Sequence, residues 1–396
     1  MPISAKVEQD MTQASWIRKM FEQGVRLKQQ HGADQVFDFS LGNPIFEPPA
    51  AVQSSLQRLV NEGPAGLHRY MPNAGHAAVR EKIAAHWRGL TGAEFADQDV
   101  IMTTGAAGAL NVALKSLLDP GDQVVIIAPY FSEYRFYVDN HGGQLVVAES
   151  SPEFDLDLAE LERKLGPRTK AVLLNTPNNP TGRMYSTERL AELGRLLADA
   201  ERAHGRPITL LSDEPYRKIV YDGLAVPSVF AAHPNTVLVL SHSKDLGLAG
   251  ERIGYALISP QHADREALRG AMTFVNRTLG FVNAPSLFQQ VAADCQDASV
   301  PVEQYQQLRD LFCAGLDRAG LEYVKPQGAF YLFPKTPTAD DMAFVQQLLA
   351  HRVLAVPGAG FGRPGHIRLS YCVTRREIET ALPLIAEAAE QARQQD

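Results

Sequence analysis

The chain is most informative at residues 237–255, which read VLVLSHSKDLGLAGERIGY. This stretch opens as a continuous apolar run, as expected of a strand buried on both faces. The run then meets Ser241, Ser243 and Lys244, followed by a glycine-rich turn that carries Arg252. An amine in a partly dry pocket has its charged form disfavoured, so Lys244 could attack an aldehyde and later carry a proton. Taken alone, the stretch also fits a surface lysine that extends into water after a strand.

The composition is that of an ordinary globular protein. The chain has 396 residues, of which 45% are hydrophobic and 21% charged, which is enough for two domains and a large core. The net charge of −7 is spread without a long basic or acidic block, so we expect no nucleic acid and no membrane as partners. The first residues lack an apolar signal core, and no apolar run approaches the roughly 18 residues that span a bilayer, which predicts a cytoplasmic protein. The scattered cysteines Cys295, Cys313 and Cys372 lack metal-ligand spacing, so we expect reduced thiols and no metal.

Short β-type runs alternate with helical stretches through the middle of the chain. The runs cover residues 100–104, 124–128, 145–148, 171–175, 208–212, 237–240 and 253–258. This alternation predicts an α/β fold in which a mainly parallel, seven-stranded sheet is covered by helices on both faces. After residue 285 the pattern changes to long helices with a few short strands. We therefore expect a large domain over residues 48–285 and a smaller α+β domain over residues 286–396, with an N-terminal segment, residues 1–47, that packs with the small domain.

The ends of the strands carry the residues from which a ligand site can be built, because ligands of such sheets bind beyond the carboxyl ends of the strands. The first run ends in TGAAGAL at residues 104–110, where Gly105, Ala106 and Ala107 open a helix. The free N–H groups of a helix start suit a phosphate, although a tight turn that binds nothing fits equally well. The spacing of this glycine-rich turn matches neither a dinucleotide loop nor a nucleoside triphosphate loop.

Other segments add aromatic, amide and acidic groups. A ring of Tyr130 or Phe131 could stack on an aromatic ligand, although such a ring is more often part of the core. A loop stiffened by prolines at residues 175–182 presents the amides of Asn178 and Asn179, or else is a structural turn. Asp213 follows a buried strand and needs a partner; a protonated ring nitrogen is one possibility, and the N-cap of a helix is the simpler one. Gly42 would let a ligand approach the backbone closely, or else marks a turn.

In this order, these features resemble the class I and II aminotransferases, which are aspartate aminotransferase-like members of the fold-type I pyridoxal-phosphate enzymes. The resemblance covers nearly the whole chain. It rests on the segments NNPTG at 178–182, SDEPY at 212–216, SHSK at 241–244 with ERIG at 251–254, QGAFY at 327–331 and VPGAGFG at 356–362. Several independent motifs in the same order argue against a chance match. The resemblance implies the fold of these enzymes and pyridoxal 5'-phosphate as the cofactor.

The resemblance also implies a role for each residue around the cofactor. Lys244 would form a Schiff base with the cofactor and then move a proton, and Asp213 would keep the pyridine nitrogen protonated. Tyr216 and Asn179 would donate hydrogen bonds to the phenolic oxygen, and Phe131, rather than Tyr130, would stack on the ring. The phosphate would be held by Gly105, Ala106, Ala107, Ser241, Ser243 and Arg252.

Substrate binding and assembly follow from the same resemblance. Arg368, in HIRLS at residues 366–370, would grip the α-carboxylate through two parallel hydrogen bonds, with Gly42 and Asn179 beside it. Tyr70 would reach the phosphate of the neighbouring subunit, which implies a homodimer with shared active sites. Without the resemblance, Tyr70 could equally be an interface or core aromatic.

The implied reaction moves the amino group of an L-amino acid to a 2-oxo acid in two half-reactions through pyridoxamine phosphate, with glutamate and 2-oxoglutarate as the default pair. The sequence does not identify the donor, because the lysine that reads an acidic side chain in one branch of the family is replaced by Ala107. Arg277 could read such a side chain from the neighbouring subunit, although a solvated helix arginine is the simpler interpretation. Two alternatives remain open: a carbon–sulfur β-lyase, which would use the same lysine, and a ligand-sensing homologue without turnover.

Overall fold

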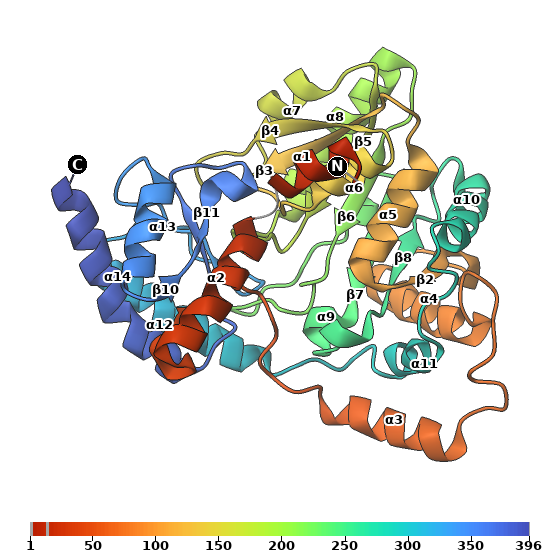
Figure 1. Ribbon diagram of the computed structural model, residues 1–396. Coiled ribbons are helices and arrows are strands. Elements are labelled where there is room, and N and C mark those ends of the chain that lie inside the picture. The colour runs from red at the N-terminus through yellow and green to blue at the C-terminus, as the bar shows by residue number, and fades with distance from the viewer. Residues whose placement is uncertain (1–2, 13–15, 396) are drawn as a thin grey trace.

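The computed structural model describes residues 3–12 and 16–395 (Figure 1). At its centre is a seven-stranded sheet with the strand order β2-β8-β7-β6-β5-β3-β4. These strands are β2 (Val100–Thr103), β3 (Gln123–Ala128), β4 (Gln144–Glu149), β5 (Thr169–Asn175), β6 (Thr209–Asp213), β7 (Thr236–Ser241) and β8 (Gly254–Ile258). The strands β4, β3, β5, β6 and β7 are parallel to one another, whereas β8 runs antiparallel to β2 and β7. The predicted α/β fold with a mainly parallel sheet is therefore confirmed.

The continuous apolar runs reflect a sheet that is buried on both faces. In β3, Val125 and Ile127 pack into one hydrophobic cluster, whereas Val124 and Ile126 pack into another on the opposite face. The first cluster includes side chains of α3 (Ala50–Glu62), α4 (Ala77–Thr91), α7 (Leu158–Lys164), α8 (Thr187–His204) and α11 (Ser286–Asp294). The second includes side chains of α5 (Gly105–Leu117), α6 (Tyr134–Asn140) and α10 (Arg265–Thr278). Each fully buried aliphatic side chain contributes roughly 1.5–3 kcal/mol to the free energy of folding. Because helices cover both faces of this sheet, its central strands carry apolar residues at successive positions.

The C-terminal part forms a third cluster around two small sheets. Strand β12 (Ile367–Ser370) lies between β11 (Val356–Pro357) and β9 (Tyr331–Leu332), and β1 (Phe37–Asp38) pairs with β10 (Val353–Leu354). The remaining helices are α1 (Ala5–Thr12), α2 (Trp16–His31), α9 (His242–Asp245), α12 (Val302–Ala319), α13 (Asp341–Ala350) and α14 (Arg375–Gln395), with 3₁₀ turns η1 (Ala33–Gln35), η2 (Asp97–Asp99), η3 (Val229–Ala231), η4 (Ala249–Glu251) and η5 (Gly358–Phe361). Met20, Phe37 and Phe39 belong to the same cluster as α12 and α14, so residues near the N-terminus pack with the C-terminal part. Figure 1 shows α2 beside these C-terminal helices.

The parallel strands bring distant residues to one edge of the large sheet. Asn175 at the end of β5 is level with Asp213 at the end of β6, and Asp213 is level with Val239, two residues before the end of β7. Chain segments that are dozens of residues apart therefore present their side chains to the same space.

Among the helices described, none is long and apolar enough to cross a membrane.

Candidate active site

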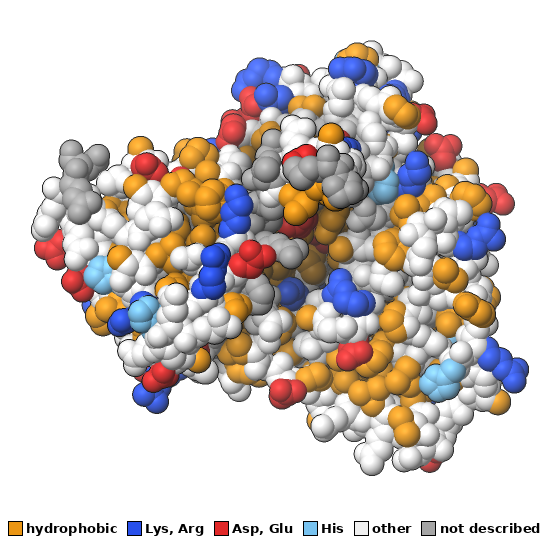
Figure 2. All heavy atoms as spheres, in the orientation of Figure 1, with side chains coloured by type: hydrophobic (Ala, Val, Ile, Leu, Met, Phe, Trp, Pro, Cys, Tyr) orange, Lys and Arg blue, Asp and Glu red, His pale blue; other side chains and the backbone are white. Residues whose placement is uncertain are grey.

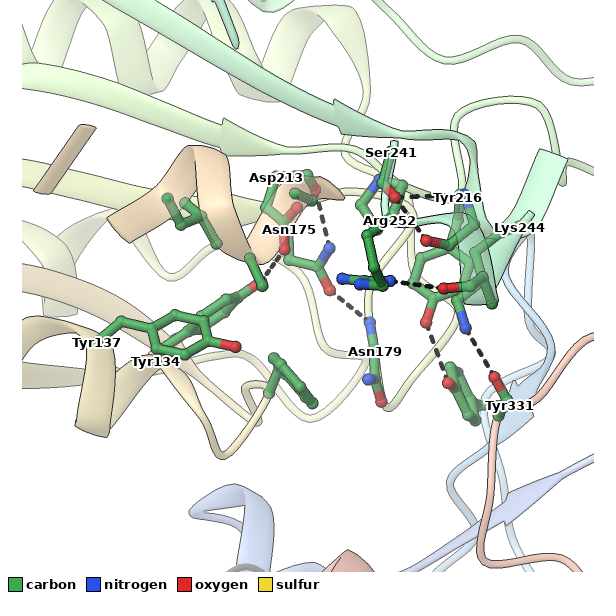
Figure 3. Close-up of a pocket in the computed structure, with 18 of the residues that line it drawn as sticks. Tyr134, Tyr137, Asn175, Asn179, Asp213, Tyr216, Ser241, Lys244, Arg252 and Tyr331 are labelled. Carbon is green, nitrogen blue, oxygen red and sulfur yellow. Dashed lines mark hydrogen bonds between the residues drawn. The ribbon is translucent and has the colours of Figure 1, made fainter. Parts of the chain in front are cut away.

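A cavity of about 290 Å³ lies beyond the carboxyl ends of β5, β6 and β7. In Figure 2 this face of the molecule is hollowed at its middle, and basic side chains lie in and beside the hollow. The cavity is lined by many of the residues singled out in the sequence: Gly42, Ala106, Ala107, Phe131, Asn179, Asp213, Tyr216, Ser241, Ser243, Lys244, Arg252 and Arg368. In Figure 3, Asp213 and Lys244 lie on opposite sides of this space. The two residues thus face a single cavity, which leaves room for a ligand between them.

Lys244 lies in α9, the short helix that directly follows β7. Ser241 caps this helix, since its hydroxyl accepts a hydrogen bond from the backbone N–H of Ser243. The Nζ atom of Lys244 donates to the carbonyl of Gly42 at 2.7 Å. Burial, assisted by the positive charges of Arg368 and Arg252, lowers the pKa of Lys244 to about 8. An amine with this pKa is partly uncharged near neutral pH and can act as a nucleophile, so the interpretation as an ordinary surface lysine is wrong.

Asp213 is the last residue of β6 and is buried. Its Oδ2 accepts a 2.6 Å hydrogen bond from the hydroxyl of Tyr134, whereas the buried Oδ1 has no hydrogen-bond partner in the described part of the chain. Burial is the main reason that the pKa of Asp213 is raised to about 7, with a further contribution from Glu214. Turn residues, not a helix, follow Asp213, so the interpretation as a helix N-cap is wrong. A buried carboxylate oxygen without a partner is costly, and a protonated ring nitrogen would satisfy it.

Two asparagines fix the loop that follows β5. The side-chain amide of Asn175 donates to the backbone carbonyl of Asp213 at 2.8 Å, and its Oδ1 accepts from the backbone N–H of Asn179 at 2.6 Å. The position of Asn179 is therefore tied to the end of β6. Its side chain is buried and reaches across to Arg368.

A group of hydrogen-bond donors gathers at the N-terminus of α5. Gly105 begins this helix with a φ of 76°, and a Cβ at this position would lie 2.9 Å from Nη2 of Arg252. The first turn of the 13-residue helix leaves the backbone N–H groups of Ala106 and Ala107 without intrahelical partners. The hydroxyls of Ser241 and Ser243, which are 2.6 Å apart, and the guanidinium of Arg252 line the same part of the cavity. Backbone N–H groups, two hydroxyls and one cation together suit a phosphate dianion.

Arg368 is a fully buried cation on β12. Its Nη1 donates to Oδ1 of Asn179 at 3.0 Å and its Nη2 donates to the carbonyl of Ser40, while Nε has no partner among the described residues. The guanidinium lies 4.6 Å from the ring centre of Tyr331. None of these contacts is a carboxylate, so the buried charge is not neutralised by the residues that the structure describes. Such a cation is strongly stabilised by an anionic ligand that offers two oxygens.

Three of the selected residues do not line the cavity. Gly105 lies just behind it, in contact range of Arg252, whereas Tyr70 lies on the outer surface with 93% of its area exposed. Arg277 is also exposed and stacks on Phe274, with 5.4 Å between guanidinium and ring centre. Within the described chain, neither Tyr70 nor Arg277 is among the residues that line the cavity.

The cavity also contains residues that sequence reasoning did not select: Leu110, Tyr134, Tyr137, Asn175, Pro215, Ala249 and Tyr331. Asn175 and Tyr331 lie in segments that had been singled out, at the end of a β-type run and in QGAFY. Tyr134 and Tyr137 carried no such signal, because aromatic residues in a helix usually belong to the core. The three cysteines are buried and unpaired, and the described residues include no group of three or more side chains that could hold a metal ion.

Comparison with known families and proteins places this geometry in context. Residues 34–385 match the model of the family described as "Aminotransferase class I and II". An aspartate/prephenate aminotransferase from Thermus thermophilus is 32% identical over 370 residues, which cover 90% of this chain and 91% of that protein. An aspartate aminotransferase from Geobacillus stearothermophilus is 33% identical, with 88% of this chain and 90% of that protein covered.

Solved structures show the same similarity in three dimensions. A crystal structure described as an amino transferase from Eubacterium rectale has a TM-score of 0.95 and 38% sequence identity, with 99% of both chains covered. The aspartate aminotransferase of Thermus thermophilus with maleate has a TM-score of 0.87 and 30% identity, with 98% of this chain and 100% of that chain covered. The similarity therefore extends over the large sheet, the C-terminal part and the cavity between them.

Proposed function

The chain belongs to the aminotransferase class I and II family, and on that basis we propose that it moves the amino group of an L-amino acid to a 2-oxo acid with the residues of the cavity described above. The protein is an aminotransferase, and its cofactor is pyridoxal phosphate. The assignment of single residues to steps of the reaction is our proposal.

The groups in the cavity fit this cofactor at each of its polar ends. The unpartnered Oδ1 of Asp213 would accept a hydrogen bond from the protonated pyridine nitrogen, and the donors at the start of α5, together with Ser241, Ser243 and Arg252, would hold the phosphate. Phe131 would stack on the ring, while Tyr216 and Asn179 would donate to its phenolic oxygen. The observation that carries the proposal is that the uncompensated Asp213 oxygen and the Lys244 amine face one cavity.

Each of these side chains then has a task in amino transfer. The cofactor supplies an aldehyde that takes up the amino group and a ring that accepts the electron pair left at the α-carbon. Lys244 would hold the cofactor through Nζ, and its amine, once free, would take the proton from the α-carbon of the amino acid and return it to the cofactor. Arg368 fixes the α-carboxylate by two parallel hydrogen bonds, which orients the α-C–H bond toward Lys244. Gly42 and Asn179 lie beside Arg368 and complete this grip.

We propose that aspartate is the donor when 2-oxoglutarate is the acceptor, and that glutamate is the donor in the reverse direction, with oxaloacetate as the acceptor. The relatives from Geobacillus stearothermophilus and Thermus thermophilus are named aspartate or aspartate/prephenate aminotransferases, and one of the solved structures holds maleate, a dicarboxylate. The cations that line the cavity in the described chain are Lys244, Arg252 and Arg368, each already assigned. A second substrate carboxylate therefore needs a cation from elsewhere, and the exposed Arg277 of a neighbouring subunit is our candidate.

We propose further that the active protein is a homodimer with shared sites. Tyr70 exposes 93% of its surface, and the apolar side chains Val60 and Phe274 expose 75% and 57%. Large side chains of this kind are rarely left in water when a partner can bury them. A second copy of the chain would bury Tyr70 and bring its hydroxyl to the phosphate site of the neighbouring subunit.

A spectral titration tests the proposal directly. The cofactor-loaded protein is mixed with single amino acids and the absorbance of the bound cofactor is followed without an acceptor, so donors are identified from the loss of the aldehyde form. Aspartate and glutamate are expected to convert it, and 2-oxoglutarate to restore it. Lys244→Ala should abolish the conversion, whereas Lys335→Ala, which removes a surface lysine that pairs with Glu322, should not. A Lys244→Ala protein that transaminates at the normal rate would refute the assigned role.

No described contact favours the carbon–sulfur β-lyase or the ligand-sensing homologue. The boundaries of the N-terminal segment at 1–47, the large domain at 48–285 and the small domain at 286–396 stay predictions, as does the cytoplasmic location. For residues 1–2 and 13–15 of the N-terminal segment, the prediction falls outside the described residues.

A further inference from the structure

A second cavity, of about 580 Å³, lies behind one wall of the active site. We propose that this cavity binds a small organic carboxylate with an apolar body, and that His242 is the residue that holds the carboxylate group. The proposal does not depend on the reaction that the active site catalyses.

The two cavities share a wall at the segment that follows β6. Pro215 lines both of them. Asp213 and Tyr216 face the active site, whereas Glu214 and Arg217, their neighbours in sequence, line the second cavity. A ligand in the second cavity would therefore touch the segment that carries Asp213 and Tyr216.

His242 gives the second cavity a polar group that lacks a partner. Its side chain is buried, and its Nδ1 faces the carboxylate of Asp245, with 3.1 Å to Oδ2. Its Nε2 is also buried and has no hydrogen-bond partner in the described part of the chain. A buried polar atom without a partner is costly, and the residue lines the cavity, so a ligand is the group that can satisfy it. An imidazole that carries a proton on both nitrogens would donate from Nδ1 to Asp245 and from Nε2 to an anion.

Two cations, Lys218 and Arg217, and three carboxylates, Glu214, Asp245 and Asp297, line the cavity with His242. Lys218 and Arg217 line the cavity, and Lys218 also donates to the backbone carbonyls of Gln296 and Ala298. Arg217 is paired with Glu214, and Asp245 is shared between His242 and Lys218. The remaining acid, Asp297, has 96% of its side chain exposed, so its charge is screened by water.

His86 also lines this cavity, and its pKa reflects the charges around it. Burial is the main reason that the pKa of His86 is lowered, and the charges of Lys218, Arg217 and His242 lower it further, against the single opposing effect of Asp297. At His86 itself, the basic groups outweigh the one opposing acid, Asp297, whose Oδ1 lies 3.5 Å from Nδ1 of His86. A carboxylate between His86 and His242 would reduce this repulsion.

The rest of the cavity is apolar and suits the body of the ligand. Its wall includes Trp87, Leu90, Leu224, Val226 and Leu240. The indole of Trp87 is fixed by a 2.9 Å hydrogen bond from its Nε1 to the hydroxyl of Tyr255, and Arg217 lies 5.0 Å from its ring centre. An aromatic ring joined to a carboxylate by a short chain matches this division into a polar end and an apolar end.

Trp87 also supplies the signal for a binding experiment. The sequence has two tryptophans, Trp16 and Trp87, so Trp16→Phe leaves Trp87 as a single fluorescent reporter on the wall of the second cavity. The cofactor-loaded Trp16→Phe protein is titrated with 3-phenylpropionate and, separately, with the uncharged 3-phenylpropan-1-ol. We expect a saturable change in fluorescence with the carboxylate at a Kd on the order of 1 mM or below, and binding of the alcohol weaker by about tenfold or more.

Variants in the same background identify the site. His242→Leu should weaken binding of 3-phenylpropionate by about tenfold or more, whereas His141→Leu, which removes a histidine that contacts Asn111 on another face, should not. Arg368→Leu should leave the signal intact, which excludes binding of the probe in the active site. Because His242 lies close to Lys244, His86→Leu serves as a second variant, and it should also weaken binding if His242→Leu fails to fold. Equal affinity for the alcohol, loss of the signal in Arg368→Leu, or no saturable signal would each overturn the proposal.

Discussion

The hydroxyl oxygens of Tyr331 and Tyr216 lie 3.0 Å apart inside the active-site cavity. The ring of Tyr331 also packs against the guanidinium of Arg368, and its hydroxyl touches the backbone at Gly42, whose carbonyl accepts the hydrogen bond from Lys244. When Tyr331 donates to Tyr216, the proton of Tyr216 is left free to point at the phenolic oxygen of the cofactor. Burial raises the pKa of Tyr216 well above its ordinary value, which keeps that proton in place.

Tyr331→Phe should therefore weaken Tyr216 as a hydrogen-bond donor. We expect kcat to fall by roughly 5- to 30-fold, which corresponds to about 1–2 kcal/mol for one buried hydrogen bond. The pH at which the absorbance of the bound cofactor changes should rise, because the anionic phenolic oxygen loses support. Tyr371→Phe is the matched control, since it removes the hydroxyl of another buried pair, 3.4 Å from that of Tyr221 and outside the cavity lining. An unchanged spectral titration in Tyr331→Phe would contradict the prediction.

Arg368→Lys should impair substrate binding while it keeps the positive charge. Lysine cannot form two parallel hydrogen bonds to a carboxylate, so we expect KM for amino acids to rise by about 100-fold or more. Reaction with a plain alkylamine, which has no α-carboxylate, should be nearly unaffected. Steady-state kinetics with an amino acid and with an alkylamine measure the two effects separately. Equal losses for both would show that the substitution damages the site as a whole.

The pKa of Lys244 makes a prediction for the protein after removal of its cofactor. Because only the uncharged amine attacks an aldehyde, the rate of covalent attachment of added pyridoxal phosphate should rise with pH, with a midpoint at about 8. Stopped-flow absorbance gives this rate, and Lys244→Ala supplies the baseline. A midpoint near the ordinary lysine value of about 10.4 would mean that the cavity does not shift this group.

Asp213→Asn should change stability in opposite directions with and without the cofactor. Without it, Asp213 has its pKa raised from 3.8 to about 7, so ionisation opposes folding increasingly as the pH rises from about 4 to about 7. The cofactor-free Asn variant should therefore be more stable than the wild type at pH 8, by on the order of 4 kcal/mol, with a smaller advantage at pH 5. With the cofactor bound, the carboxylate gains its partner and the variant should be the less stable protein. Thermal unfolding at both pH values, with and without cofactor, tests the reversal of sign.

Mixing two inactive variants tests whether the sites are shared. In a dimer of Lys244→Ala with Tyr70→Ala, one site would contain an intact Lys244 and an intact Tyr70 from different chains. Refolding an equal mixture should recover about a quarter of the wild-type activity. Tyr137→Ala with Lys244→Ala is the control, because Tyr137 lines the cavity of its own chain and no site in that dimer is intact. Equal recovery in both mixtures would rule out a role for Tyr70 across the interface.

Most of the large sheet could be predicted because its strands are buried on both faces and therefore appear as uninterrupted apolar runs. The direction of β8 was not predicted, since such a run is the same for a parallel and an antiparallel strand. The connection from Ser241 to Gly254 was the available clue, because a parallel crossover usually contains a full helix. Here that connection contains only the short helix α9 and the turn η4.

The residues gathered in the cavity could be predicted where they follow strand ends, because parallel strands bring their carboxyl ends to one edge. Asn179, Asp213 and Lys244 are of this kind. Tyr134 could not be found in this way: it is 79 residues from Asp213 in the chain, and the two meet only because α6 packs over the sheet. Tyr331 lay in a recognised segment, but its contact with Tyr216 depends on how the C-terminal part packs against the large sheet.

The two anchors of Arg368 have a consequence for enzyme engineering. Asn179 and the carbonyl of Ser40 both accept hydrogen bonds from this guanidinium, and both lie in buried surroundings. Simple amines have no α-carboxylate, so a redesign for such substrates suggests an apolar residue at position 368. Such a residue would leave Oδ1 of Asn179 and the carbonyl of Ser40 buried without a hydrogen-bond donor. Each acceptor without a donor would lower the stability of the protein by about 1–3 kcal/mol. A successful redesign has to supply new donors for Oδ1 of Asn179 and for the carbonyl of Ser40, and has to keep Asn179 itself for the cofactor.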